Sequence, residues 1–87
     1  KNPFRIEYQE INVARLQELV DNNKIHAGDT VNIEILRNLG VVRSSRIPVK
    51  ILGNGDLTAK LNVTAAKFTE SAKGKIEQAG GTAVIDE

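Results

Sequence analysis

Residues 47–64 read IPVKILGNGDLTAKLNVT, and this stretch decides the fold that the sequence predicts. Residues 47–52 are mostly aliphatic and β-branched, which is typical of a strand. Residues 57–64 alternate between apolar and polar side chains, which is the pattern of a half-buried strand. Between them, residues 53–55 are Gly-Asn-Gly and tolerate the positive φ angles of a tight turn. We therefore expect a β-hairpin that pairs 47–52 with 57–64.

The alternation also predicts a polar outer face of this hairpin. Cationic side chains on such a face suit phosphates, and short polar groups suit sugars and 2′-hydroxyls. The residues expected on or beside this face are Arg43, Arg46, Lys50, Thr58, Lys60 and Asn62. An ordinary solvated outer face explains the same pattern, and these residues alone leave both interpretations open.

Apolar residues at helical spacing predict two helices before the hairpin. Asn12 can cap the first, because its side-chain oxygen can accept a backbone N–H of the first turn, and residues 21–23 end it. Asn32 can cap the second, and Gly40 lies where a glycine commonly ends a helix. The apolar faces consist of Val13, Leu16, Leu19 and Val20, then of Ile33, Leu36 and Leu39.

A third helix is expected after the hairpin, capped by Thr69 or Ser71 and ended by the glycines at 80–81. Residues 4–9 alternate and predict a first strand that ends or bulges just after them. Residues 82–85 predict a closing strand. The order is strand, helix, helix, strand, strand, helix, strand, which predicts an α/β fold with helices packed on a sheet.

Composition limits the classes of function. A length of 87 residues fits one small domain, and one Tyr with two Phe predicts an aliphatic core. The absence of cysteine excludes disulfides and thiolate chemistry within this sequence. His26 has no carboxylate at a spacing that would orient it as a base, and Asp29, Glu34 and Asp56 lack metal-ligand spacing. We predict no catalytic residue, no metal and no cofactor.

Basic residues are concentrated in the middle of the chain. Residues 41–75 contain seven Lys or Arg and two Asp or Glu, whereas the net charge of the whole chain is +1. A basic middle suggests a side that faces a polyanion. Charge alone favours an ordinary mixed surface, because surfaces commonly have charges at this density.

A set of matched positions between residues 50 and 80 identifies a family resemblance. They are Lys50-Ile51-Leu52-Gly53, Gly55, Leu57, Leu61, Val63, Phe68-Thr69, Ala72, Ile76 and Gly80. In this spacing they resemble the C-terminal signature of the large-subunit ribosomal protein fifteen family. Residues 8–13 and the Gly28-Asp29 turn also look like that family. The resemblance implies an α/β fold of irregular repeated β-β-α turns, of the ribosomal protein fifteen and eighteen-e type.

The resemblance implies that residues 1–87 are a single globular domain, the C-terminal part of a longer chain. The family's basic N-terminal arm has no counterpart in this sequence. The implied function is that of a structural constituent of the large ribosomal subunit, which binds and braces its large ribosomal RNA beside neighbouring ribosomal proteins. The implied location is the cytoplasmic ribosome, or an organellar one.

These implications add neither an enzyme activity nor a membrane or small-molecule partner. The alternative function is a basic protein–protein interaction module with the same fold, which is expected to expose an apolar patch. Charge and strand facing give the candidate RNA-binding residues: Arg43, Arg46, Lys50, Lys60 and Lys67.

Overall fold

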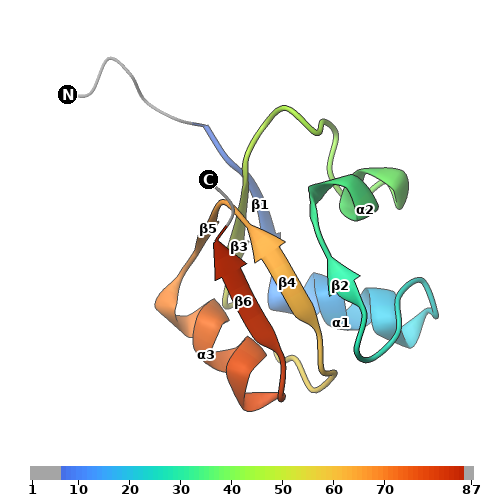
Figure 1. Cartoon of the computed structure of the whole chain (residues 1–87), viewed down its shortest axis with the longest axis vertical. Coiled ribbons are helices and arrows are strands. Elements are labelled where there is room, and N and C mark those ends of the chain that lie inside the picture. The colour runs from blue at the N-terminus through green and yellow to red at the C-terminus, as the bar shows by residue number, and fades with distance from the viewer. Residues whose placement is uncertain (1–6, 86–87) are drawn as a thin grey trace.

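The computed structural model describes residues 7–85 and contains two short parallel sheets with three helices (Figure 1). The first sheet has the strand order β1-β3-β5, and the second has the order β2-β4-β6. The elements are β1 (Gln9–Asn12), α1 (Val13–Asp21), β2 (Thr30–Val31), α2 (Ile33–Asn38), β3 (Val49–Leu52), β4 (Asn62–Ala65), β5 (Lys67–Phe68), α3 (Glu70–Gln78) and β6 (Thr82–Ile85). The predicted α/β class is confirmed, and the short strands β2 and β5 are additions to it.

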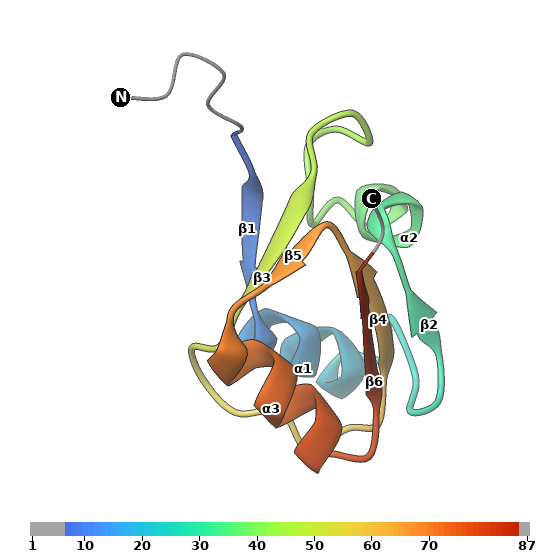
Figure 2. The ribbon, with the colours of Figure 1, turned by 60° about the vertical axis from the view of Figure 1, so that its left-hand side comes forward.

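The helices occupy two different places around the sheets. Helices α1 and α3 lie at one end, where they contact each other and α3 also contacts β3, β5 and β6 (Figure 2). Helix α2 lies toward the opposite end, next to β2. The two sheets meet through contacts of β3 with β4 and of β5 with β6. We call the end of α1 and α3 the lower end, and the end of Figure 1 where β3 and β5 begin the upper end.

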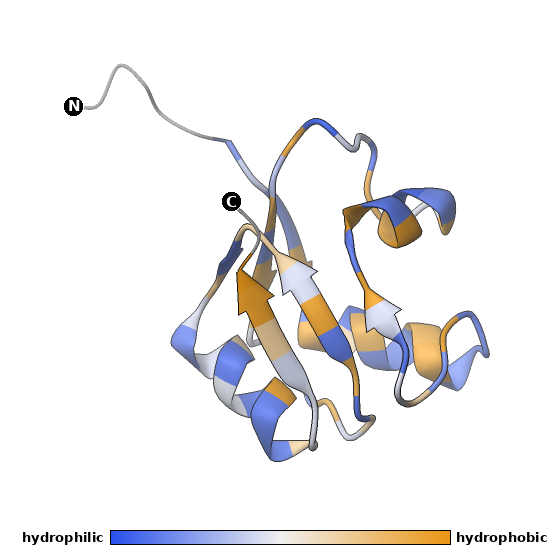
Figure 3. Ribbon diagram, in the orientation of Figure 1, coloured by the Kyte–Doolittle hydropathy of each residue, from blue (hydrophilic) through white to orange (hydrophobic). Residues whose placement is uncertain are grey.

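The core lies between these layers and is aliphatic, as composition predicts. In the first sheet, Ile11, Ile51 and Phe68 are register partners, so their side chains form one row that points inward. Figure 3 shows the apolar residues on the strands and on one side of the helices. The largest fully buried side chains are Leu16, Leu36, Ile51, Leu61 and Ile76.

The predicted β-hairpin is wrong. Strand β3 ends at Leu52 and β4 begins only at Asn62, and the two strands belong to different sheets. Each pairs in parallel with its neighbours, which a tight turn cannot achieve because parallel strands need a crossover connection. The alternation nevertheless identifies buried positions correctly, since Leu57, Leu61 and Val63 are all buried.

The glycines of residues 53–55 serve a close approach to two helices. A Cβ on Gly53 would overlap the side chain of Ser71 and would lie 2.7 Å from the backbone nitrogen of Ala72. Gly55 has φ +89°, and a Cβ there would collide with Ala14. The segment therefore fits between the first turns of α1 and α3, where only small residues leave enough room.

Hydrogen bonds hold this segment in place. Lys75 on α3 donates from Nζ to the carbonyl oxygen of Gly53 at 2.7 Å and to that of Gly55. The backbone N–H of Ala14, in the first turn of α1, donates to the carbonyl oxygen of Asn54 at 3.2 Å. The segment thus links the two lower helices and satisfies a free donor of α1.

Two of the three predicted helix caps are confirmed. The Oδ1 atom of Asn32 accepts from the N–H of Ile35 at 2.9 Å, and the Oγ1 atom of Thr69 accepts from that of Ala72 at 3.2 Å. Asn12 occupies the N-cap position of α1, but its side chain makes no capping bond and its Oδ1 atom is buried without a partner in the described part of the chain. The predicted cap by Asn12 is therefore wrong. The carbonyl oxygen of Asn54 accepts from the first-turn N–H of Ala14 instead.

The first strand is shifted from its predicted position. Of the predicted residues 4–9, residues 4–6 lie outside the described part of the chain, and β1 runs from Gln9 to Asn12. The predicted end or bulge near Glu10 is wrong, because β3 supplies register partners without interruption through Asn12. The predicted helix ends at residues 21–23 and 80–81 and the closing strand at 82–85 are confirmed.

Two glycine substitutions test this packing, and they should change the free energy of unfolding in opposite directions. Gly53→Ala should lower the free energy of unfolding by about 1–3 kcal/mol, because the added methyl overpacks the contact with α3. Gly74→Ala, in the interior of α3 with nothing within 4 Å of an added Cβ, should raise it by about 0.5–1 kcal/mol. Urea unfolding measures both, and a Gly53→Ala variant as stable as the parent would contradict the described contact.

Candidate nucleic-acid interface

Two of the predicted RNA-binding lysines are neighbours on the outer face of the first sheet. Lys50 on β3 and Lys67 on β5 are register partners, so their side chains leave the sheet on the same side. Their neighbours Ile51 and Phe68 point to the core, which forces both lysines outward. Lys67 is exposed and Lys50 is half-buried.

The local charge of this row is positive. Glu10 is the register partner of Lys50 on the other side, so the row contains two cations and one anion. Within residues 7–85 the ion pair between Arg15 and Glu18, at 3.0 Å on α1, is the only one. Like charges beside each other on a sheet destabilise it slightly, and a bound anion would relieve that repulsion.

The two predicted arginines lie on the connection between α2 and β3, and Gln9 holds that connection in place. The Nε2 atom of Gln9 donates to the carbonyl oxygens of Ser44 at 2.7 Å and Ile47 at 2.8 Å. Its Oε1 atom accepts from the N–H of Arg43 at 2.8 Å and from that of Ser44 at 3.3 Å. The side chain of Gln9 is thus fully engaged, while Arg43 and Arg46 are exposed.

The arginines and the lysine pair lie at the same end of the molecule. The connection from α2 enters β3 at the upper end, where β5 also begins (Figure 1). This connection is also bonded to the backbone of β1, because the N–H of Gln9 donates to the carbonyl oxygen of Pro48 at 2.8 Å. We call this region the basic end, and its residues are Arg43, Arg46, Lys50 and Lys67.

The fifth predicted residue, Lys60, is not part of the basic end. It precedes β4, which starts at the lower end of the second sheet, and its carbonyl oxygen accepts from the N–H of Gly28 at 2.6 Å. Thr58 and Asn62 are predicted to share a strand face with Lys60, but only Asn62 lies in a strand, because β4 begins there; all three residues are exposed or half-buried. The N–H of Thr58 donates to Gln17 on α1 at 2.9 Å, and Asn62 accepts from the hydroxyl of Thr82 on β6 at 2.9 Å.

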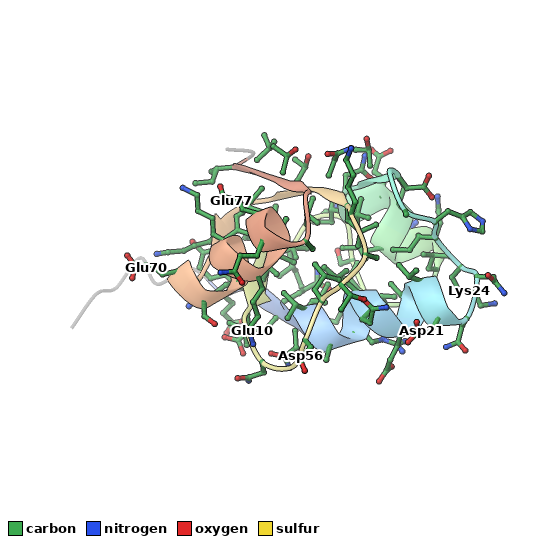
Figure 4. All side chains as sticks on the ribbon, turned by 90° about the horizontal axis from the view of Figure 1, so that it is seen from below. Glu10, Asp21, Lys24, Asp56, Glu70 and Glu77 are labelled. Atoms are coloured by element: carbon green, nitrogen blue, oxygen red, sulfur yellow. The ribbon has the colours of Figure 1, made fainter. Side chains whose placement is uncertain are left out.

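The lower end has a balanced mixture of charges, because residues 13–24, 53–60 and 70–78 contain five Lys or Arg and five Asp or Glu. Figure 4 views the molecule from below, with charged side chains of both signs around α1, α3 and the segment between β3 and β4. The labelled side chains are Glu10, Asp21, Lys24, Asp56, Glu70 and Glu77. The local excess of positive charge therefore lies at the basic end, and the lower end is close to neutral.

The described residues offer little to catalysis. Within residues 7–85, no group of three His, Cys, Asp or Glu side chains gathers closely enough to hold a metal ion. The side chain of His26 is exposed, and its backbone N–H donates to the carboxylate of Asp29 at 2.8 Å, which confirms Asp29 as a turn former. None of the helices in this part of the chain is long and apolar enough to cross a membrane.

Comparison with known proteins identifies the family. The model of a family described as ribosomal proteins 50S-L15, 50S-L18e and 60S-L27A matches residues 10–84. The chain belongs to this ribosomal protein family. The resemblance inferred from residues 50–80 is confirmed, and the interaction-module alternative is not favoured.

Curated relatives in the family share the name large ribosomal subunit protein uL15. The protein from Bradyrhizobium diazoefficiens is 45% identical over 84 residues, which cover 97% of this chain and 52% of the relative. That from Corynebacterium glutamicum strain R is 48% identical over 98% of this chain and 53% of the relative. That from Synechococcus sp. strain CC9311 is 57% identical over 72% of this chain and 42% of the relative. The chain thus spans about half the length of the curated relatives it matches.

Gln9 is the residue that the sequence reasoning missed. The predicted strand 4–9 assigned it to an outer face, but only 9% of its surface is exposed. Its burial could have been predicted from residues 9–13, because Gln9, Ile11 and Val13 are every second residue and the last two are apolar. Gln9 therefore falls on the same side as the buried Ile11 and Val13. A polar residue in a buried phase needs partners, and it commonly binds backbone groups.

Replacing Gln9 tests its control of the arginine loop. Gln9→Ala should speed hydrogen exchange at the amides of Arg43 and Ser44 and lower the free energy of unfolding by about 1–3 kcal/mol, because buried backbone groups lose their partners. Gln78→Ala, at an exposed position of α3, is the matched control and should change stability by less than about 0.5 kcal/mol. Equal exchange in the two variants would contradict the role of Gln9.

Proposed function

We propose that this chain is a structural constituent of the large ribosomal subunit that binds and braces its large ribosomal RNA. The basic end supports this proposal most directly, because family membership alone does not say which surface meets RNA. Arg43, Arg46, Lys50 and Lys67 lie at one end, whereas cations and carboxylates are equal in number at the other. An RNA backbone would be attracted to the first end more strongly than to the second.

The proposed contact is with phosphates and shape. The basic end has no fully exposed aromatic side chain on which bases could stack, since Tyr8 and Phe68 are both half-buried and the exposed imidazole of His26 lies on the turn before β2. The arginines can bind phosphate oxygens in a bidentate manner, whereas the lysines act as point charges. Because Gln9 fixes the arginine loop to β1, less loop entropy is lost on binding.

We further propose that residues 1–87 act as one globular domain, with neighbouring ribosomal proteins as additional partners. The chain works in the ribosome, in the cytoplasm of a bacterium or in an organelle. It has a bracing role and performs no reaction. Lys60 remains a candidate for a separate RNA contact, away from the basic end.

Removing the lysine pair tests the proposal. The double variant Lys50→Ala and Lys67→Ala should weaken binding to large-subunit ribosomal RNA by about tenfold, at about 0.7 kcal/mol for each exposed contact. The slope of log K against log salt should become shallower by about 1.8, because two phosphate contacts are lost. Fluorescence anisotropy over a series of salt concentrations measures both quantities.

A matched control removes the same charge from the lower end. Arg15→Ala with Lys24→Ala changes residues on and just after α1 and should leave affinity and salt slope close to those of the parent. If both double variants lost the same affinity, binding would depend on net charge alone and the basic end would not be the interface.

A further inference from the structure

A cleft opens at the upper end where three separate segments converge. The start of α2, the loop before β3 and the end of β4 form its sides, and Val49 and Ala65, almost fully buried, form its floor. Ile33 and Pro48 add half-buried apolar surface. Its volume is about 180 Å³. Since an apolar cavity of about 150 Å³ holds a benzene ring, one six-membered ring fits this cleft.

Polar groups at the mouth of this cleft have no partner among residues 7–85. The hydroxyl groups of Ser45 and Thr64 and the guanidinium of Arg46 line it, and none takes part in a hydrogen bond or ion pair with another described residue. Each hydroxyl can donate or accept. The mouth therefore offers hydrogen bonds for the edge of a ring and a positive charge for an attached anion.

A second hollow continues from the first across Ser45. It is lined by Glu34, Arg37 and Asn38 together with Ser45. In this second hollow, Arg37 supplies another cation, and the carboxylate of Glu34 partly offsets its charge. A flexible polyanion could thus follow the surface from Arg46 toward Arg37, with one ring inserted between them.

We infer that this cleft binds one unstacked pyrimidine nucleotide of RNA, with its base between Ile33 and Pro48 and its phosphate on Arg46. The inference rests on the proposed RNA-binding function and adds a base subsite to it. Proteins bind single RNA bases mainly at loops and bulges, where a base can leave the stack. Here an aliphatic slot takes the place of aromatic side chains, none of which lines this cleft. The cationic mouth favours a nucleotide over an apolar peptide side chain.

A bulged hairpin RNA tests the subsite with the full 87-residue chain. The two probes are a hairpin with one bulged uridine and the same hairpin without the bulge, compared by anisotropy over the same series of salt concentrations. The parent chain should bind the bulged hairpin about fivefold more tightly, because one more base is buried. In two-dimensional NMR spectra, this hairpin should shift the amides of residues 45–49 and 64–66 more than the uninterrupted one does.

Filling the cleft should abolish this preference. Ala66→Leu adds volume to the cleft without changing charge and should make the two affinities equal, while binding of the uninterrupted hairpin stays unchanged. Ala79→Leu is the matched control, because it fills a hollow at the lower end beside Lys75 and Gln78 and should keep the preference. If Ala66→Leu fails to fold, Ser45→Ala with Thr64→Val removes the hydroxyls instead and should reduce the preference.

The outcomes separate this inference from the proposed function. Equal, salt-sensitive binding of both hairpins by the parent would overturn the base subsite and leave the RNA-binding function standing. A preference that survives Ala66→Leu would also overturn the subsite. No salt-sensitive binding to either hairpin would overturn both.

Discussion

Strand β3 is paired in parallel on both of its edges, with β1 and with β5, and the positions of the functional residues depend on this pairing. It inserts Ile51 between Ile11 and Phe68 in the core and thereby turns Lys50 and Lys67 outward as neighbours. It also brings Gln9 beside the loop that leads into β3. Because parallel neighbours need a crossover, the chain after β3 must leave the sheet and pass across α1 and α3 before β4 begins.

The arrangement gathers a local excess of cations at the basic end, although the whole chain has a net charge of only +1. The upper end presents arginines on a loop that is held by side-chain hydrogen bonds, and the lower end presents cations and carboxylates in equal number. Such a molecule has an orienting field even when its net charge is small. In our account the domain is therefore a directional brace, in which one end meets phosphates and the other faces away from them.

The sequence was most informative where the signal is local. The helical spacing around Leu16 and Leu36 and the alternation at Leu61 and Val63 identified buried residues correctly, because burial follows the period of each element. The predicted hairpin was wrong because a glycine indicates a bend but not which segment packs against it. Gly53 must be small because it packs against Ser71, 18 residues away. Of the five candidate site residues, four share one end and Lys60 does not, because its predicted place depended on that hairpin. Gln9 was missed because its partners lie more than 30 residues along the chain.

The most direct test of the account is ultraviolet cross-linking of purified large ribosomal subunits that contain this chain, followed by mass spectrometry of its RNA-linked peptides. We predict that cross-links fall within residues 43–50 and at Lys67, at the basic end. Cross-links confined to α1, α3 and residues 53–60 would show that the lower end faces the RNA, and that result would contradict the account.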